Sequence, residues 1–113
     1  GESMRYINLT PHQISIQLST GDVITVEPSG DVARVEQDDV YQCKDSNGVS
    51  YYRTTYHELK GVPVSVPGVM YIVSGLVLSA SRRTDLAAPS ELIRDSEGRV
   101  IACRGLRLAD PAR

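Results

Sequence analysis

The sequence predicts a mainly β (α+β) fold, a compact curled antiparallel sheet or small barrel of about seven strands with one short helix. Three observations support this prediction. Apolar and polar residues alternate at positions 13–19, as they do in a half-buried strand. The dipeptide Asn47-Gly48 favours the positive φ angles of a tight hairpin turn. Residues 74–81 combine an apolar run with a residue, Ser74, that commonly begins a helix.

The first half of the chain is expected to form short strands and hairpins. Residues 5–9 form a strand that ends before Pro11, and residues 13–27 form a hairpin that turns near Gly21. A turn at 28–30 precedes a short strand at 32–35. The acidic residues 36–39 are expected in a solvated loop, and the arms of the Asn47-Gly48 hairpin at 40–44 and 49–56.

The second half begins with an extended connector at residues 61–68, because Pro63 and Pro67 cannot pair within a central strand. Residues 70–73 are expected to form a buried strand that runs into the helix, with Ser74 as its N-cap. Residues 91–94 and 99–106 flank a turn at 95–98 and form a third hairpin.

Residues 4–108 are expected to form one globular domain, since 113 residues is the size of a single domain. Residues 1–3 resemble the remnant of a cleaved tag, and residues 109–113 are expected to fray. No apolar run reaches the length of a membrane span and no signal peptide follows Met4, so we expect no membrane contact and a cytosolic location. Cys43 and Cys103 are expected to be thiols.

The charge pattern excludes an extensive nucleic-acid face. The net charge is −2, and the basic excess of residues 71–113 is too small to attract a polyanion. We therefore expect no specific nucleic-acid partner. Arginine greatly outnumbers lysine, which either reflects a GC-rich genome or provides forked donors for carboxylates and phosphates.

The sequence predicts no enzyme, no cofactor and no metal. It contains no G-x-S-x-G elbow, no Walker loop and no dinucleotide fingerprint. His12, Cys43, His57 and Cys103 lie too far apart in the sequence for the spacing of a local metal site. His57 and Glu58 are strand neighbours that point to opposite faces, so we expect them to be exposed polar residues and not an acid–base pair.

Three segments carry groups suited to an anion. Ser74 either presents free N–H groups to an anion or only caps the helix. Asp85 either holds Arg83 as a fork for a phosphate, or simply pairs with it after a helix whose dipole the arginines complement. Arginines of the last hairpin either join this site or pair across the turn. The candidate ligand-binding residues are Ser74, Arg83, Asp85, Arg94 and Arg104, with Tyr71, Tyr56 and Arg53 as stacking or supporting groups.

Several segments share a recognisable pattern: INLTPH at 7–12, PSG and ARV within 28–35, RTTY at 53–56, YIVS at 71–74, RTDL at 83–86, and 94–106 ending in CRGL. Together they resemble a family of small uncharacterised proteins encoded by tailed phages and prophages. The resemblance spans the chain from Met4 to about Leu108, although the pattern has glycine where this chain has Ser90 and Ala102. It implies a phage protein in the host bacterial cytoplasm and implies no particular activity.

We therefore expect a non-enzymatic counter-defence protein that sequesters an anionic, nucleotide-type signalling molecule of host antiviral immunity. The alternatives are a phage protein that binds and inhibits a host protein, and a minor virion or assembly component; a homo-oligomer is left open. Sequestration predicts a concave, arginine-lined site. An inhibitor predicts an exposed apolar or charged patch, and a virion component predicts self-association through sheet edges.

Overall fold

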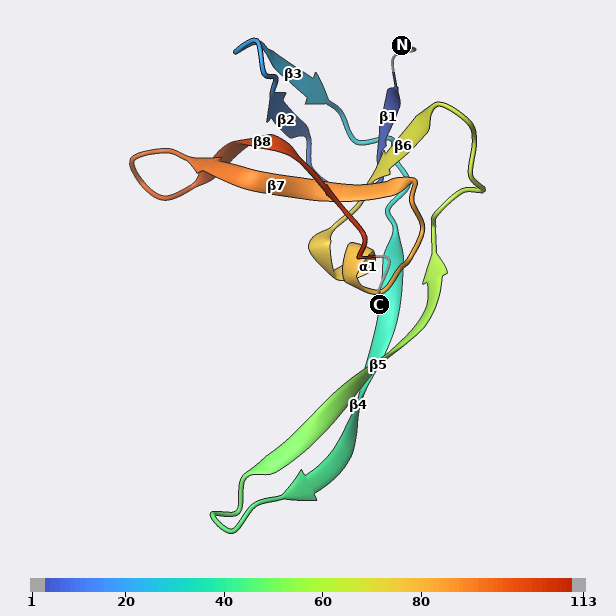
Figure 1. Cartoon of the computed structure of the whole chain (residues 1–113), viewed down its shortest axis with the longest axis vertical. Helices are drawn as coiled ribbons and strands as arrows, with labels where there is room; N and C mark the ends of the chain where they lie inside the picture. The colour runs from blue at the N-terminus through green and yellow to red at the C-terminus, as the bar shows by residue number, and fades with distance from the viewer. Residues whose placement is uncertain (1–3, 111–113) are drawn as a thin grey trace.

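The computed structural model describes residues 4–110, which form eight β-strands and one short α-helix (Figure 1). The predicted mainly β fold with one short helix is confirmed. The predicted tag remnant, residues 1–3, and residues 111–113 of the predicted frayed end lie outside the described residues. In chain order the elements are β1 (Arg5–Asn8), β2 (Ile14–Gln17), β3 (Val23–Val26), β4 (Arg34–Lys44), β5 (Ser50–Lys60), β6 (Val69–Ile72), α1 (Gly75–Ser79), β7 (Leu86–Arg94) and β8 (Val100–Leu108).

Six strands form one mixed sheet in the order β1-β6-β7-β8-β2-β3. Of the two predicted forms, a curled antiparallel sheet or a small barrel, the structure has a nearly closed barrel, and its sheet is mixed because β1 pairs with β6, β6 with β7, and β2 with β8 in parallel. Only β2–β3 and β7–β8 are antiparallel hairpins within it. The parallel pairs join strands whose connections are too long for a hairpin, so local turn signals do not reveal them.

Asn8 joins the two edge strands, so that the sheet nearly closes into a barrel. A bridge links Asn8 of β1 to Pro28, just after β3. The buried Asn8 amide nitrogen donates to the carbonyl oxygens of His12 at 2.7 Å and Val26 at 3.0 Å. Its Oδ1 accepts from the backbone N–H and the hydroxyl of Thr10, at 2.9 and 2.7 Å. The two edges of the six-stranded sheet are therefore joined by the Asn8 side chain, whose amide nitrogen and oxygen both have hydrogen-bond partners.

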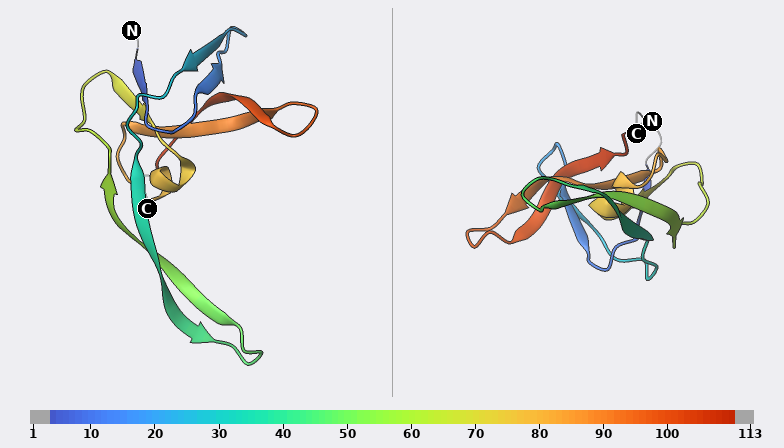
Figure 2. Two further views of the ribbon diagram at one scale, coloured as in Figure 1. Left: turned by 180° about the vertical axis from the view of Figure 1, so that it is seen from behind. Right: turned by 90° about the horizontal axis from the view of Figure 1, so that it is seen from below.

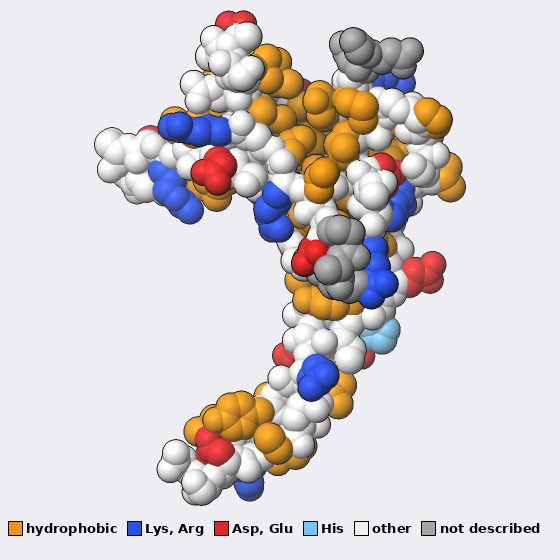
Figure 3. Space-filling model, in the orientation of Figure 1, with side chains coloured by type: hydrophobic (Ala, Val, Ile, Leu, Met, Phe, Trp, Pro, Cys, Tyr) orange, Lys and Arg blue, Asp and Glu red, His pale blue; other side chains and the backbone are white. Residues whose placement is uncertain are grey.

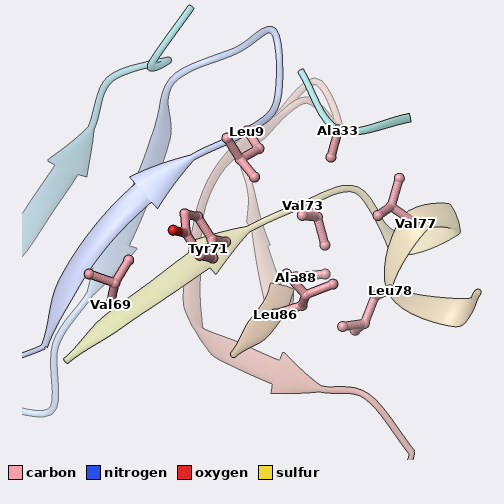
Figure 4. Packing of buried hydrophobic residues seen from close by; sticks show 9 residues of the cluster. All are labelled: Leu9, Ala33, Val69, Tyr71, Val73, Val77, Leu78, Leu86 and Ala88. Carbon is pink, nitrogen blue, oxygen red and sulfur yellow. The ribbon is translucent and has the colours of Figure 1, made fainter. Parts of the chain in front are cut away.

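Each face of the sheet carries a hydrophobic core. On one face, side chains of β6 and β7 pack against α1, Leu9 and Ala33 (Figure 4). On the other face, Ile16, Ile72 and Cys103 are buried together. Tyr71 and Ile72 belong to different cores, because successive residues of a strand point to opposite faces.

The β4–β5 hairpin extends away from this body (Figures 1 and 2). Its base is anchored, since Val35 and Leu59 pack against the first core. Every residue from 36 to 58 is exposed except Asp45, which is half-buried. We call residues 36–58 the arm. The radius of gyration is 17.0 Å, against about 13 Å for a compact chain of this length, because the arm projects.

The hairpin turns are where the sequence predicts them. Gly48 has a φ of +87°, and Oδ1 of Asp45 accepts from the backbone N–H groups of Asn47 and Val49 at 2.9 and 3.0 Å. The equivalent turn of the β7–β8 hairpin uses Asp95 in the same way. Local turn chemistry thus determines the tips of both hairpins.

Two local predictions are wrong. The acidic residues 36–39 lie in β4 and not in a loop, and β4 replaces the short strand expected at 32–35. The helix ends at Ser79, so Arg82 and Arg83 follow it and its last turn contains no basic residue. No helix among residues 4–110 is long and apolar enough to cross a membrane.

Candidate functional site

The structure brings Tyr71, Arg83 and Asp85 together beside the connector, residues 61–68. Arg83 donates from Nε to Oδ1 of Asp85 at 2.8 Å and from Nη2 to Oδ2 at 2.6 Å. Its Nη2 also donates to the carbonyl oxygen of Pro63 at 3.0 Å, and its guanidinium lies 6.0 Å from the centroid of the Tyr71 ring. The Tyr71 hydroxyl donates to the carbonyl oxygen of Val64 at 3.1 Å. We call these three residues the clamp, because they fasten the connector to the sheet.

The clamp's electrostatics are those of a paired, partly buried ion pair. The Arg83 hydrogen bonds lower the pKa of the Asp85 carboxyl, while partial burial opposes them. The same pairing raises the pKa of Arg83. Asp85 and Arg83 therefore pair directly, an arrangement that both interpretations of these residues share. Tyr71 is only 2% exposed, so its ring offers no stacking surface to a ligand.

Ser74 caps α1 as predicted. Its hydroxyl accepts from the backbone N–H of Val77 at 3.3 Å. The helix has five residues, and Arg107 of β8 lies at its start, where a Cβ on Gly75 would come within 2.8 Å of Nη2. This hydrogen bond supports the interpretation of Ser74 as the N-cap of the helix.

The arginines of the β7–β8 turn serve the turn itself. Arg94 donates to the carbonyl oxygen of Gly98 at 2.9 Å. Arg99 pairs with Asp95 at 3.0 Å and with Glu97 at 2.7 Å. Hydrogen bonds to Asp95, first from the Arg99 backbone N–H, lower the pKa of that carboxyl. The predicted pairing with Asp95 and Glu97 is observed for Arg99, whereas Arg94 bonds the Gly98 carbonyl oxygen and neither acid.

Arg104 has a different setting from the other candidate arginines. It lines a shallow hollow of about 270 Å³ between β1, β8 and the β2–β3 hairpin, together with Tyr6, Ile24 and Leu106. No side-chain hydrogen bond or ion pair engages Arg104 within the described chain. The hollow therefore combines apolar walls with one unpaired positive charge. Of the candidate arginines this is the one best placed to meet an anion.

A second depression contains no charged residue. It has a volume of about 420 Å³ and lies between the start of β2 and the β7–β8 hairpin. Leu92, Val100 and Ile101 line it and are about half exposed. This open, apolar groove suits hydrophobic contact more than a charged ligand.

The remaining two candidates, Arg53 and Tyr56, lie on the arm, and they lie on opposite faces of it. Figure 1 shows the arm and the β7–β8 turn pointing in different directions from the body. The structure therefore unites Tyr71, Arg83 and Asp85, and separates them from Arg94 and from the arm residues. The eight candidate residues do not line one concave site.

Tyrosines give the arm a distinctive face. Tyr41 and Tyr52 sit opposite each other across the two strands, with ring centroids 6.0 Å apart in an edge-to-face arrangement. Tyr56 shares their face, since it lies an even number of residues from Tyr52. The side chains of Tyr41, Tyr52 and Tyr56 are 54, 60 and 43% exposed. Figure 3 shows hydrophobic side chains gathered toward the end of the arm, away from the body.

Polar pairs hold the two strands of the arm together on both of its faces. On the tyrosine face Asp39 accepts from the hydroxyl of Thr54 at 2.7 Å, and on the other face Asp38 contacts Nε2 of His57 at 2.6 Å. These pairs explain why acidic residues occupy a strand. The sequence does contain the dense tyrosines and the Asn47-Gly48 turn of this arm, but its length and lack of cover become visible only in the structure.

Within residues 4–110, no three His, Cys, Asp or Glu side chains are grouped so that they could hold a metal ion. No protein-family model, curated protein or solved structure matches the chain.

Proposed function

We propose that this chain is a non-enzymatic binding protein of phage or prophage origin, and that it binds another protein through its arm. The observation that carries the proposal is the arm itself, the part of the β4–β5 ribbon at residues 36–58, which is exposed except for Asp45. An isolated two-stranded hairpin is at best marginally stable in water. A partner that covers the ribbon would supply the missing contacts.

The chemistry of the arm fits a protein partner. Tyrosine is enriched at the centres of protein interfaces, because its ring buries a large apolar area while its hydroxyl keeps a hydrogen bond. The arm presents Tyr41, Tyr52 and Tyr56 on one face, with Tyr41 directly opposite Tyr52. This favours the protein-binding alternatives over sequestration, which requires a concave site lined with arginines.

Site-specific photo-crosslinking tests the proposal. A photoreactive phenylalanine analogue at Tyr52, in bacteria that carry the gene in its phage or prophage, should form an adduct with a protein. Val23 of β3 is the matched control, since it is 57% exposed against 60% for Tyr52. Equal adducts from both positions, or none from Tyr52, would contradict the proposal.

Arg104 supports sequestration of a small anion as a second candidate function. Its unpaired charge borders an apolar hollow, an arrangement that suits a ligand with a phosphate and an apolar or aromatic part. Calorimetric titration with cyclic oligonucleotides and cyclic ADP-ribose isomers tests it. Binding that is lost in Arg104→Ala would favour this function, and no heat across the panel would remove it.

A further inference from the structure

The edge strands of the two sheets differ in whether they are paired. The six-stranded sheet brings β1 and β3 together through Asn8, so its edges are largely closed. The β4–β5 ribbon is a separate two-stranded sheet, and each of its strands has one edge with no partner strand among residues 4–110. An exposed edge is a template for pairing with another chain, and proteins usually block it with charges, proline or bulges.

Along the middle of the ribbon only β4 is blocked in this way, because the other register shift, between Val35 and Gln37, places its extra residue in β5 beyond Tyr56. β4 carries Glu36, Asp38 and Asp39, and a register shift between Tyr41 and Cys43 places an extra residue in it. Such charges and bulges disfavour pairing with a further strand. The edge of β4 is therefore unsuited to strand addition.

The edge of β5 is open. Its pairing with β4 is regular from Tyr52 to Tyr56, and in residues 50–56 only Arg53 is charged. This stretch contains no proline or glycine and is rich in tyrosine and threonine, which favour strands. It has the composition of a segment that pairs readily with another strand.

We propose that the partner of this edge is β5 of a second copy of the chain, so that two arms join into one four-stranded antiparallel sheet. This proposal rests on the proposed function and names the partner. A two-fold symmetric contact places the same strand on both sides, and the two strands then run antiparallel. This contact uses only the unpaired edge of β5 in each copy.

Side-chain charges select the register. When the two-fold axis passes through Thr54, Tyr52 faces Tyr56 of the second copy and Arg53 faces Thr55. Moving the axis to residue 53 opposes two Arg53 guanidinium groups, and moving it to residue 55 places Tyr52 opposite the charged Glu58 instead of opposite a tyrosine. Like charges directly opposite each other destabilise a sheet. The register centred on Thr54 avoids both conflicts and overlaps the regular part of the strand.

The available surface indicates a weak dimer. Tyr51, Tyr52 and Tyr56 are 48, 60 and 43% exposed, which leaves about 300 Å² of tyrosine surface per copy. A standard interface buries about 800 Å² per partner, of which roughly 60% is apolar. The contact is smaller than that, so we expect a micromolar dissociation constant.

Sedimentation of the purified full chain, through the micromolar range, is the first test. We expect a concentration-dependent dimer. Tyr56→Thr should weaken it about tenfold, because the symmetric contact loses two tyrosine pairs. Tyr6→Thr, a matched control at 39% exposure against 43% for Tyr56, should leave the dimer unchanged.

Disulfide trapping tests the register. In a Cys43→Ser background, which removes the exposed thiol, Thr54→Cys faces itself across the axis and should give a covalent dimer on oxidation. Thr55→Cys is the control, because its two Cα atoms would lie about 8 Å apart, beyond the reach of a disulfide.

Each result has a clear meaning. A dimer that responds to Tyr56→Thr and is trapped by Thr54→Cys alone supports the proposal. A monomer at all concentrations overturns it, as does a dimer insensitive to Tyr56→Thr or trapped equally at Thr55. If the purified chain is monomeric but Tyr52 crosslinks to a different protein in cells, the proposed function stands and the second copy is excluded.

Discussion

Removing the Asp85 carboxylate should destabilise the fold, because the clamp attaches the connector to the sheet. In Asp85→Ala the Arg83 guanidinium loses both hydrogen bonds to the carboxylate and keeps only the Pro63 carbonyl. Arg83 is then no longer held in the orientation in which it bonds to the connector, so this attachment is weakened.

The expected magnitude lies between two limits. Exposed ion pairs contribute about 0–1 kcal/mol, whereas removing one partner of a fully buried pair costs about 3–5 kcal/mol. The side chains of Arg83 and Asp85 are 32 and 12% exposed, so this pair is closer to the buried limit. We expect Asp85→Ala to lower the free energy of unfolding by about 2–3 kcal/mol, and Asp85→Asn by less, since the amide keeps one acceptor.

Urea unfolding measures this change, with the slope m as a check that the denatured state is unaltered. Asp31→Ala is a suitable control, because Asp31 is exposed and forms no ion pair with any residue of 4–110; it should change stability by less than about 0.5 kcal/mol. Hydrogen exchange should also rise in residues 61–68 of Asp85→Ala. If Asp85→Ala is as stable as the unaltered chain, the clamp is not structural, and Arg83 becomes available to a ligand after all.

Three further predictions concern the same framework. Gly61→Ala should lower the free energy of unfolding in urea by about 2–4 kcal/mol, because its Cβ would lie 2.5 Å from the Val32 carbonyl oxygen. Gly68→Ala is the control, since Gly68 has nearly the same φ but lies in open space, and it should cost only about 1–2 kcal/mol. Equal costs for the two variants would contradict the close approach at Gly61. Asn8→Ala should lower the free energy of unfolding by about 3 kcal/mol or more in the same assay, since it removes the partner of buried backbone groups. A loss below about 1 kcal/mol would show that the barrel closes without the Asn8 side chain. The free energy of unfolding should fall on acidification, because the pKa of Asp85 is lower in the folded state than in the unfolded state. The contribution of Asp85 is therefore fully present above its unfolded pKa of about 3.9 and is lost as the pH falls through its folded pKa. Asp85→Asn should flatten this part of the profile of stability against pH.

The parts of the fold that the sequence reveals are local. The turn at Asn47-Gly48 is set by the positive φ of Gly48 and by the neighbouring Asp45, so it can be recognised from a few residues. The parallel pairing of β2 with β8 joins Ile16 to Cys103, and no short motif marks such a distant partner. Local signals therefore predict the hairpins of the sheet but not its parallel pairs.

The acidic residues 36–39 were misassigned for a related reason. Considered alone, an acidic run favours a solvated loop. In the structure Asp38 and Asp39 meet His57 and Thr54, which lie 19 and 15 residues away in the sequence, and these pairs make a strand acceptable. The partner of each acid depends on the hairpin register, which the turn alone specifies only near its tip.

The candidate site shows the same division. Arg83 and Asp85 are close in sequence, so their pairing was foreseeable. Their contact with Pro63 was not, because it depends on how the connector folds back onto the sheet, and it turns a candidate ligand fork into a structural one. The prolines of the connector were interpreted only as an obstacle to pairing, although the Pro63 carbonyl oxygen is what Arg83 binds.

The asymmetry of the arm also limits how far association can proceed. Growth into a filament requires two open edges on every copy, one for each neighbour. The acids and the bulge of β4 leave each copy with a single open edge, that of β5. Pairing of β5 with β5 therefore uses the open edge of both copies at once, and the outer strands of the resulting four-stranded sheet are the two acidic β4 strands. In this arrangement the charges on β4 act to stop assembly at two.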